Sequence, residues 1–86
     1  MKTSEEKIIA YCDYVKAVLI SKNKKYGDSA LHPLRIFSNA DANEQLRVRI
    51  DDKINRIKNQ KQDDEDAILD LIGYLILYQV SGLPDE

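Results

Sequence analysis

The 86-residue sequence predicts an all-α domain of three helices, with a long connection after the first helix and a helical hairpin in the C-terminal half. Three segments place apolar residues at helical spacing, and residues that favour helix caps precede them. No segment shows a strand pattern that competes with this interpretation. The length suits one small core, so we treat residues 1–86 as a single domain.

The first helix is expected from about Ser4 to Asn23. Thr3 and Glu6 form a capping-box pattern at its start. The apolar stripe of this helix is wider than a narrow seam, because tyrosines flank it. We expect Cys12, on that stripe, to be a buried structural thiol. The stripe consists of Ile8, Cys12, Val15 and Leu19, widened by Tyr11, Tyr14 and Val18.

The connection "KYGDSALHPLRIFSNAD", residues 25–41, interrupts the helical periodicity. Connections of this length inside a compact domain are usually functional or flexible. Gly27 offers a hinge, and basic residues lie on either side of it. We therefore expect this loop to close over a phosphate group, with Lys22, Lys25 and Arg35 as donors.

The second helix should begin after Asp41, where Glu44 completes a box-like cap. Its apolar stripe repeats at helical spacing and charged residues flank it on both sides. The stripe is Leu46, Ile50, Ile54 and Ile57; the flanks are Arg47 with Asp51, and Arg49 with Asp52 and Arg56.

The third helix should be capped near Asp63 or Asp64 and end before Gly82 and Pro84. Residues 67–78 are aliphatic apart from one aspartate, one glycine and two tyrosines. We expect these tyrosines, Tyr74 and Tyr78, to belong to the core or to an interface.

The sequence contains more apolar helix surface than three helices can cover. The third helix is apolar around nearly its whole circumference, and the first has a wide apolar arc. Exposed patches of this kind mark interfaces. We therefore predict a homo-oligomer, a dimer in the simplest case, in which helices from symmetry-related copies pack together.

The net charge of −2 is unevenly distributed. From Lys22 to Lys61 there are ten basic residues against five acidic ones, whereas only acids follow from Gln62 onward. A basic middle segment suggests anionic partners such as phosphates. The alternative is a solvated helix face that the acidic segment neutralises.

Composition also narrows the cellular setting. No apolar run reaches the roughly eighteen residues needed to cross a bilayer, so we expect no membrane partner. The N-terminal "MKTSEEK" leads into charged helix rather than a signal peptide. A single cysteine excludes an internal disulfide and a zinc site built on several cysteines. These features predict a cytoplasmic protein.

Asp70 is the one carboxylate in the apolar part of the third helix. A buried charge is costly unless a partner compensates it. One interpretation joins Asp66 and Asp70 with Asp51 or Asp52 around a Mg²⁺ ion, which prefers oxygen ligands. The other pairs Asp70 with a basic residue of the second helix. The candidates for that pair are Lys53 and Arg56, and the sequence leaves both interpretations open.

Three blocks resemble a known family: "KNKKYGDSALHPLRIFS", "EQLRVRIDDKINRI" and "DEDAILDLIGYLIL". In this order they resemble the nucleotide-modification-associated domain family of phage and bacterial genomes, related to the MazG-like nucleoside triphosphate pyrophosphohydrolases. The resemblance covers roughly residues 22–78 and implies a MazG-like helical fold. The functional positions that it implies are Lys22, Tyr26, Gly27, Arg49, Asp52, Lys53, Arg56, Asp66 and Asp70.

The second helix departs from the pattern of a MazG-type enzyme, which presents several glutamates one turn apart on its first metal helix. Here Asp51 and Asp52 stand among Arg49, Lys53 and Arg56. Basic side chains on the metal face weaken the case for hydrolysis with several Mg²⁺ ions. They favour a site in which basic side chains bind phosphate groups directly.

We therefore expect a phage-type protein, in the host cytoplasm if phage-encoded, that binds a nucleotide or a nucleotide-derived phosphate compound rather than nucleic acid. If it is an enzyme, Mg²⁺ on Asp52, Asp66 and Asp70 would activate water and release pyrophosphate. The alternative is a non-catalytic protein that sequesters a signalling nucleotide of host defence. In the enzymatic scheme Lys22, Lys53 and Arg56 would hold phosphate oxygens and Tyr26 would face the base.

Overall fold

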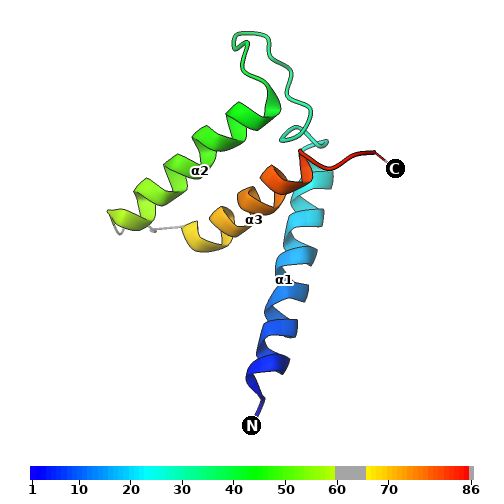
Figure 1. Ribbon diagram of the computed structural model, residues 1–86, viewed down its shortest axis with the longest axis vertical. Helices are drawn as coiled ribbons and strands as arrows, with labels where there is room; N and C mark the ends of the chain where they lie inside the picture. The colour runs from blue at the N-terminus through cyan, green and yellow to red at the C-terminus, as the bar shows by residue number, and fades with distance from the viewer. Residues whose placement is uncertain (60–65, 86) are drawn as a thin grey trace.

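The structure, a computed structural model, describes residues 1–59 and 66–85 (Figure 1). It contains three helices: α1 (Ser4–Lys25), α2 (Ala42–Lys58) and α3 (Ala67–Val80). Within these residues there is no strand, so the predicted all-α class is confirmed. Searching the same residues finds no helix with the length and apolarity that a bilayer span requires.

The predicted caps of the first two helices are present. The Thr3 hydroxyl accepts a hydrogen bond from the backbone N–H of Glu6 at 3.1 Å, and the capping box is complete. The Asp41 carboxylate accepts from the N–H of Glu44 at 2.8 Å. α1 continues to Lys25, two residues beyond the expected end, and its last turn carries three lysines. Cations there interact favourably with the helix dipole.

Asp66 is the N-cap of α3, and its carboxylate accepts from the N–H of Leu69 at 2.9 Å. The cap expected at Asp63 or Asp64 lies outside the described residues. Ala67, the first helical residue, is 0% exposed. The helix therefore begins where its first residue enters the core, and the acid immediately before that residue supplies the cap.

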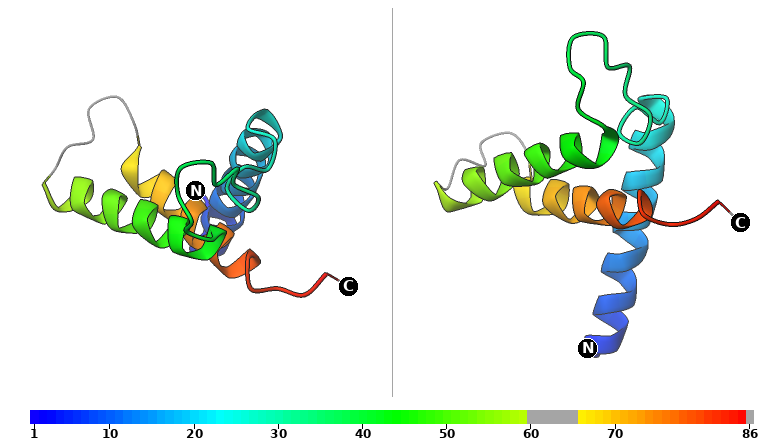
Figure 2. Two further views of the ribbon diagram at one scale, coloured as in Figure 1. Left: turned by 90° about the horizontal axis from the view of Figure 1, so that it is seen from above. Right: turned by 45° about the horizontal axis from the view of Figure 1, so that its top comes forward.

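α2 and α3 form the predicted hairpin and lie side by side, while α3 also crosses the C-terminal half of α1 (Figures 1 and 2). A hydrogen bond joins the two helices of the hairpin: Arg47 Nε of α2 donates to the phenol oxygen of Tyr78 of α3 at 2.9 Å. This hydrogen bond is the main reason that the pKa of Arg47 is raised above its ordinary value. The N-terminal half of α1 projects beyond the hairpin (Figure 2).

The core is small, and the prediction that Cys12 is buried is wrong. Among the described apolar residues only Val15, Leu46 and Ala67 are fully buried. Cys12 is exposed, as is Ile8 on the same stripe at 63%. The physical reason is that the N-terminal half of α1 extends past α3, so within the described part of the chain its apolar stripe is only partly covered.

Candidate functional site

A cavity of about 520 Å³ lies where the three helices meet, and we call it the three-helix cavity. Its volume is within the range of small-molecule sites. Apolar residues of α1 and α3 form much of its wall, and the turn after α1 contributes Tyr26 and Ser29. Its charged lining residues are Lys22 from α1, Arg49 and Lys53 from α2, and Asp70 from α3.

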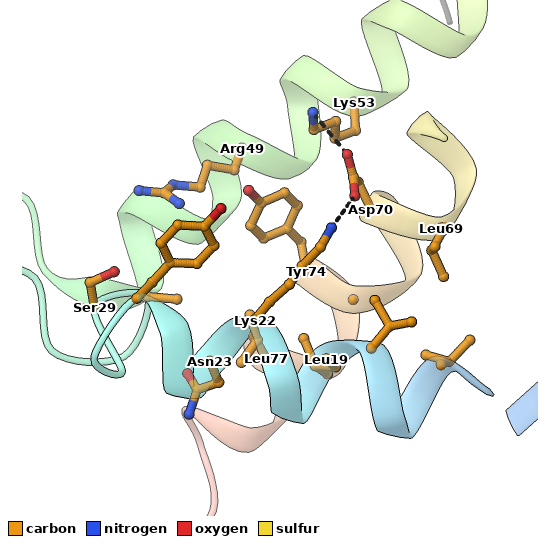
Figure 3. Close-up of a pocket in the computed structure, with 15 residues that line it drawn as sticks. Leu19, Lys22, Asn23, Ser29, Arg49, Lys53, Leu69, Asp70, Tyr74 and Leu77 are labelled. Atoms are coloured by element: carbon orange, nitrogen blue, oxygen red, sulfur yellow. Dashed lines mark hydrogen bonds and ion pairs between the residues drawn. The ribbon is translucent and has the colours of Figure 1, made fainter. Parts of the chain in front are cut away.

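Asp70 is held between two lysines from the other two helices (Figure 3). Lys22 Nζ donates to one carboxylate oxygen at 3.2 Å, and Lys53 Nζ lies 3.3 Å from the other. The Asp70 side chain is 18% exposed and that of Lys53 is 11% exposed, whereas Lys22 is half exposed. The interpretation that Asp70 pairs with a basic residue of the second helix is therefore supported, and Lys22 is an additional partner that the sequence did not indicate.

A close approach of α1 to α3 brings Lys22 to this position. A methyl group added at Gly73 would lie 3.5 Å from Leu19 Cδ1, so the two helices meet at this glycine. Lys22 follows Leu19 by one helical turn, and Asp70 precedes Gly73 by one turn. The crossing at Leu19 and Gly73 therefore sets the ion pair between α1 and α3.

Arg49 is the third cation of the cavity, and its guanidinium carbon lies 5.8 Å from the ring centroid of Tyr74. Such a contact favours the cation electrostatically. Among the described lining residues, Lys22, Lys53 and Arg49 face the carboxylate of Asp70, an excess of two positive charges. A partly enclosed site with this charge attracts anions.

The structure separates the sequence-predicted residues into two groups. Lys22, Tyr26, Arg49, Lys53 and Asp70 line the three-helix cavity. The others do not line it. Asp52 pairs with Arg56 at 3.3 Å on the outer side of α2, and Asp66 caps α3. Lys25 lies over the ring of Tyr26, and Gly27 and Arg35 have positive φ angles of 62° and 60° in the connection.

The predicted Mg²⁺ ligands are engaged with other groups. Asp70 faces two ammonium groups, Asp52 pairs with Arg56 and Asp66 binds a backbone N–H. Within residues 1–59 and 66–85, no three His, Cys, Asp or Glu side chains gather as a metal site would require. A cation placed at Asp70 would also meet the repulsion of both lysines. This arrangement does not fit the expected three-carboxylate site, and we derive no reaction step through a metal.

Tyr74 lines the cavity, although the sequence suggested a core or interface role. It is half-buried and follows Asp70 by four residues, so both side chains lie on one face of α3. Asn23 and Ser29 also line the cavity. The helical spacing from Asp70 was the signal that could have identified Tyr74 in advance.

No family model, curated protein or solved structure matches the chain. The resemblance of the three sequence blocks therefore stays a prediction, and function is argued from the three-helix cavity.

Proposed function

We propose that this protein binds a nucleotide or nucleotide-derived phosphate compound in the three-helix cavity. The observation that carries the proposal is that Lys22, Lys53 and Arg49 line one partly enclosed cavity. Ammonium and guanidinium groups are the usual donors to phosphate oxygens. The rings of Tyr26 and Tyr74 line the same space and offer surfaces on which a base can stack.

The charge of the lining favours a ligand with about two negative charges. Among the described lining residues, cations exceed carboxylates by two. A nucleoside monophosphate, or two groups joined by a diphosphate linkage, matches that charge at neutral pH. A nucleoside triphosphate carries more negative charge than the lining neutralises, so we expect weaker binding of a triphosphate in the absence of Mg²⁺.

Asp70 organises the site before the ligand arrives. Its two oxygens hold the ammonium groups of Lys22 and Lys53 on the same side of the cavity. Donors that are already in position lose less conformational entropy when they bind an anion. On α2, basic residues such as Arg49 and Lys53 line the cavity in place of the several acids that a metal-dependent hydrolase of the resembled family presents, which favours binding without turnover.

We accordingly favour a phage-type protein that sequesters a nucleotide, such as a signalling nucleotide of host defence. The second candidate is a Mg²⁺-dependent pyrophosphohydrolase related to the MazG-like enzymes, as the resemblance implies. We also propose that the protein acts as a homo-oligomer. Many of its apolar side chains, including Tyr14 at 52% and Ile20 at 49%, are exposed in the single chain.

Calorimetric titration with a nucleotide panel, with Mg²⁺ and with chelator, tests the proposal. The panel contains nucleoside mono-, di- and triphosphates and a dinucleotide with a diphosphate linkage. Each mixture is then separated by chromatography. Recovery of intact, bound nucleotide supports sequestration, whereas Mg²⁺-dependent release of pyrophosphate supports the hydrolase. Absence of binding to every member would overturn the assignment of the cavity.

Two lysine variants on α1 provide a matched comparison. Lys22→Ala removes a cavity cation, and Lys7→Ala removes an exposed lysine near the start of the same helix. Loss of a charge-assisted hydrogen bond costs about 1.5–3 kcal/mol, so Lys22→Ala should weaken binding by roughly 10- to 100-fold. Lys7→Ala should bind like the wild type. Equal affinity of the two variants would place the ligand elsewhere.

A further inference from the structure

The chain has a larger solvent-accessible surface than is typical of a compact monomeric protein of its mass. The chain exposes 7052 Å². The scaling of surface with mass gives about 5,200 Å² for 9.9 kDa, which leaves an excess of roughly 1,800 Å². Its radius of gyration is 14.7 Å, against about 12 Å for a compact chain of 86 residues. Both quantities show that the chain is more extended than a compact monomer of this mass.

Part of this excess surface is a groove between α1 and α3, with a volume of about 790 Å³, which we call the α1–α3 groove. Its walls are almost entirely apolar and include Tyr11, Ile20, Ile72, Ile76 and Val80. Several of these side chains are substantially exposed, for example Tyr11 at 45% and Ile76 at 39%. An apolar concavity of this kind marks an interaction site.

The groove shares residues with the three-helix cavity. Val15, Leu19 and Leu77 line both spaces, so these side chains form a common wall at the packing contact between α1 and α3. Whatever covers the groove therefore supports the wall of the three-helix cavity as well.

We propose that a second copy of this chain covers the α1–α3 groove. The excess of roughly 1,800 Å² per chain lies within the range of about 1,000–2,500 Å² that one partner buries in an obligate homodimer. A smaller apolar ligand could fill the groove but would leave most of that excess exposed. The area thus points to a protein partner of comparable size.

The projecting half of α1 supplies the complementary surface. It extends beyond the hairpin (Figures 1 and 2). Its Ile8 is 63% exposed, Ile9 54% and Tyr14 52%. A two-fold axis lets each copy lay this half-helix along the groove of the other, so that one patch is used twice. The two α1 and two α3 helices then form a four-helix core. This inference rests on the homo-oligomer proposed above, whose interface it specifies, and is independent of nucleotide binding.

Cys12 provides a native reporter because it lines the groove, is exposed in the single chain and is the only cysteine. In the assembly it lies under the partner, so a thiol reagent should modify it slowly. The label rate and the light-scattering mass are measured on the same wild-type sample at tens of micromolar. We expect twice, or an even multiple of, the chain mass of 9.9 kDa.

Two matched variants locate the interface. Ile76→Asp places a charge in the groove, whereas Ile54→Asp places the same charge on α2, where Ile54 is 49% exposed and outside the groove. Ile76→Asp should lower the mass and accelerate Cys12 labelling several-fold, and Ile54→Asp should change neither. Tyr11→Lys, an exposed change on α1, repeats the test if Ile76→Asp loses its helical circular dichroism.

A monomeric wild type would overturn the proposal, whether or not Cys12 reacts quickly. An oligomer that survives both Ile76→Asp and Tyr11→Lys would also overturn it, because the interface would then lie outside the groove. If Ile54→Asp dissociates the oligomer and Ile76→Asp does not, the interface lies on α2 and the proposal is also overturned.

Discussion

Replacing Asp70 by asparagine tests what balances this carboxylate. The substitution keeps the size of the side chain and one acceptor oxygen but removes the charge that faces Lys22 and Lys53. If the lysines are the compensating groups, the variant loses stability whether or not a divalent metal is present. If Mg²⁺ is the compensating group, the metal-free fold loses little and the response to Mg²⁺ disappears.

The geometry gives the expected magnitude. At 3.3 Å and an effective dielectric constant of about 20, the Asp70–Lys53 attraction is roughly 5 kcal/mol before desolvation is counted. Removing one partner of a buried pair typically costs about 3–5 kcal/mol. The Lys22 pair is half exposed and adds no more than about 1 kcal/mol. Since Asp70 is itself 18% exposed, we expect the lower end, about 3 kcal/mol.

Thermal melts at one fixed protein concentration measure this loss, which corresponds to a fall in Tm of about 12–24 °C for a domain of this size. Asp52→Asn is the matched control, because Asp52 forms an exposed pair with Arg56 on one face of α2. That variant should lose less than about 0.5 kcal/mol. Each melt is run with Mg²⁺ and with chelator.

The assignment of Lys22 and Lys53 as the groups that balance Asp70 is refuted if Asp70→Asn melts like the wild type in chelator while only the wild type gains stability from Mg²⁺. That pattern would restore the metal site and the hydrolase. Lys53→Met and the double variant complete a mutant cycle, in which a coupling energy near zero would also count against the ion pair.

Three further predictions concern the surroundings of the site. Asp66→Ala should destabilise the protein by about 1 kcal/mol in urea, equally with Mg²⁺ and chelator, because the side chain caps the N–H of Leu69; a loss that appears only with Mg²⁺ would make Asp66 a ligand. Gly73→Ala should leave stability unchanged or raise it by up to about 1 kcal/mol, because the added methyl meets Leu19 at an ordinary 3.5 Å, whereas a large loss would indicate tighter packing. Hydrogen exchange in residues 24–40 should slow when a nucleotide binds, and unchanged exchange in a complex shown to be saturated would exclude closure of this loop.

The helices and two of the caps were predictable because they depend on neighbours within about one turn. Thr3 with Glu6 and Asp41 with Glu44 form in the structure as the spacing indicated. The start of α3 was not predictable in the same way, because consecutive acids offered several equivalent caps. Burial of Ala67, a tertiary effect, accompanies the cap at Asp66.

The exposed state of Cys12 has a related explanation. The apolar stripe of α1 is partly exposed in the single chain, and its cover by another copy stays a prediction. Periodicity does not say whether the cover comes from the same chain or from another copy, since both bury the same side chains.

By itself, the sequence determined the three helices, the position of Asp70 in an apolar helix and the need for a cation beside it. Only the tertiary structure decided which cation. Lys22 lies 48 residues from Asp70 and reaches it because α1 and α3 meet at Leu19 and Gly73, while Lys53 arrives through the hairpin. Local spacing specifies a helix, but helix crossings depend on side-chain packing between segments far apart in the chain.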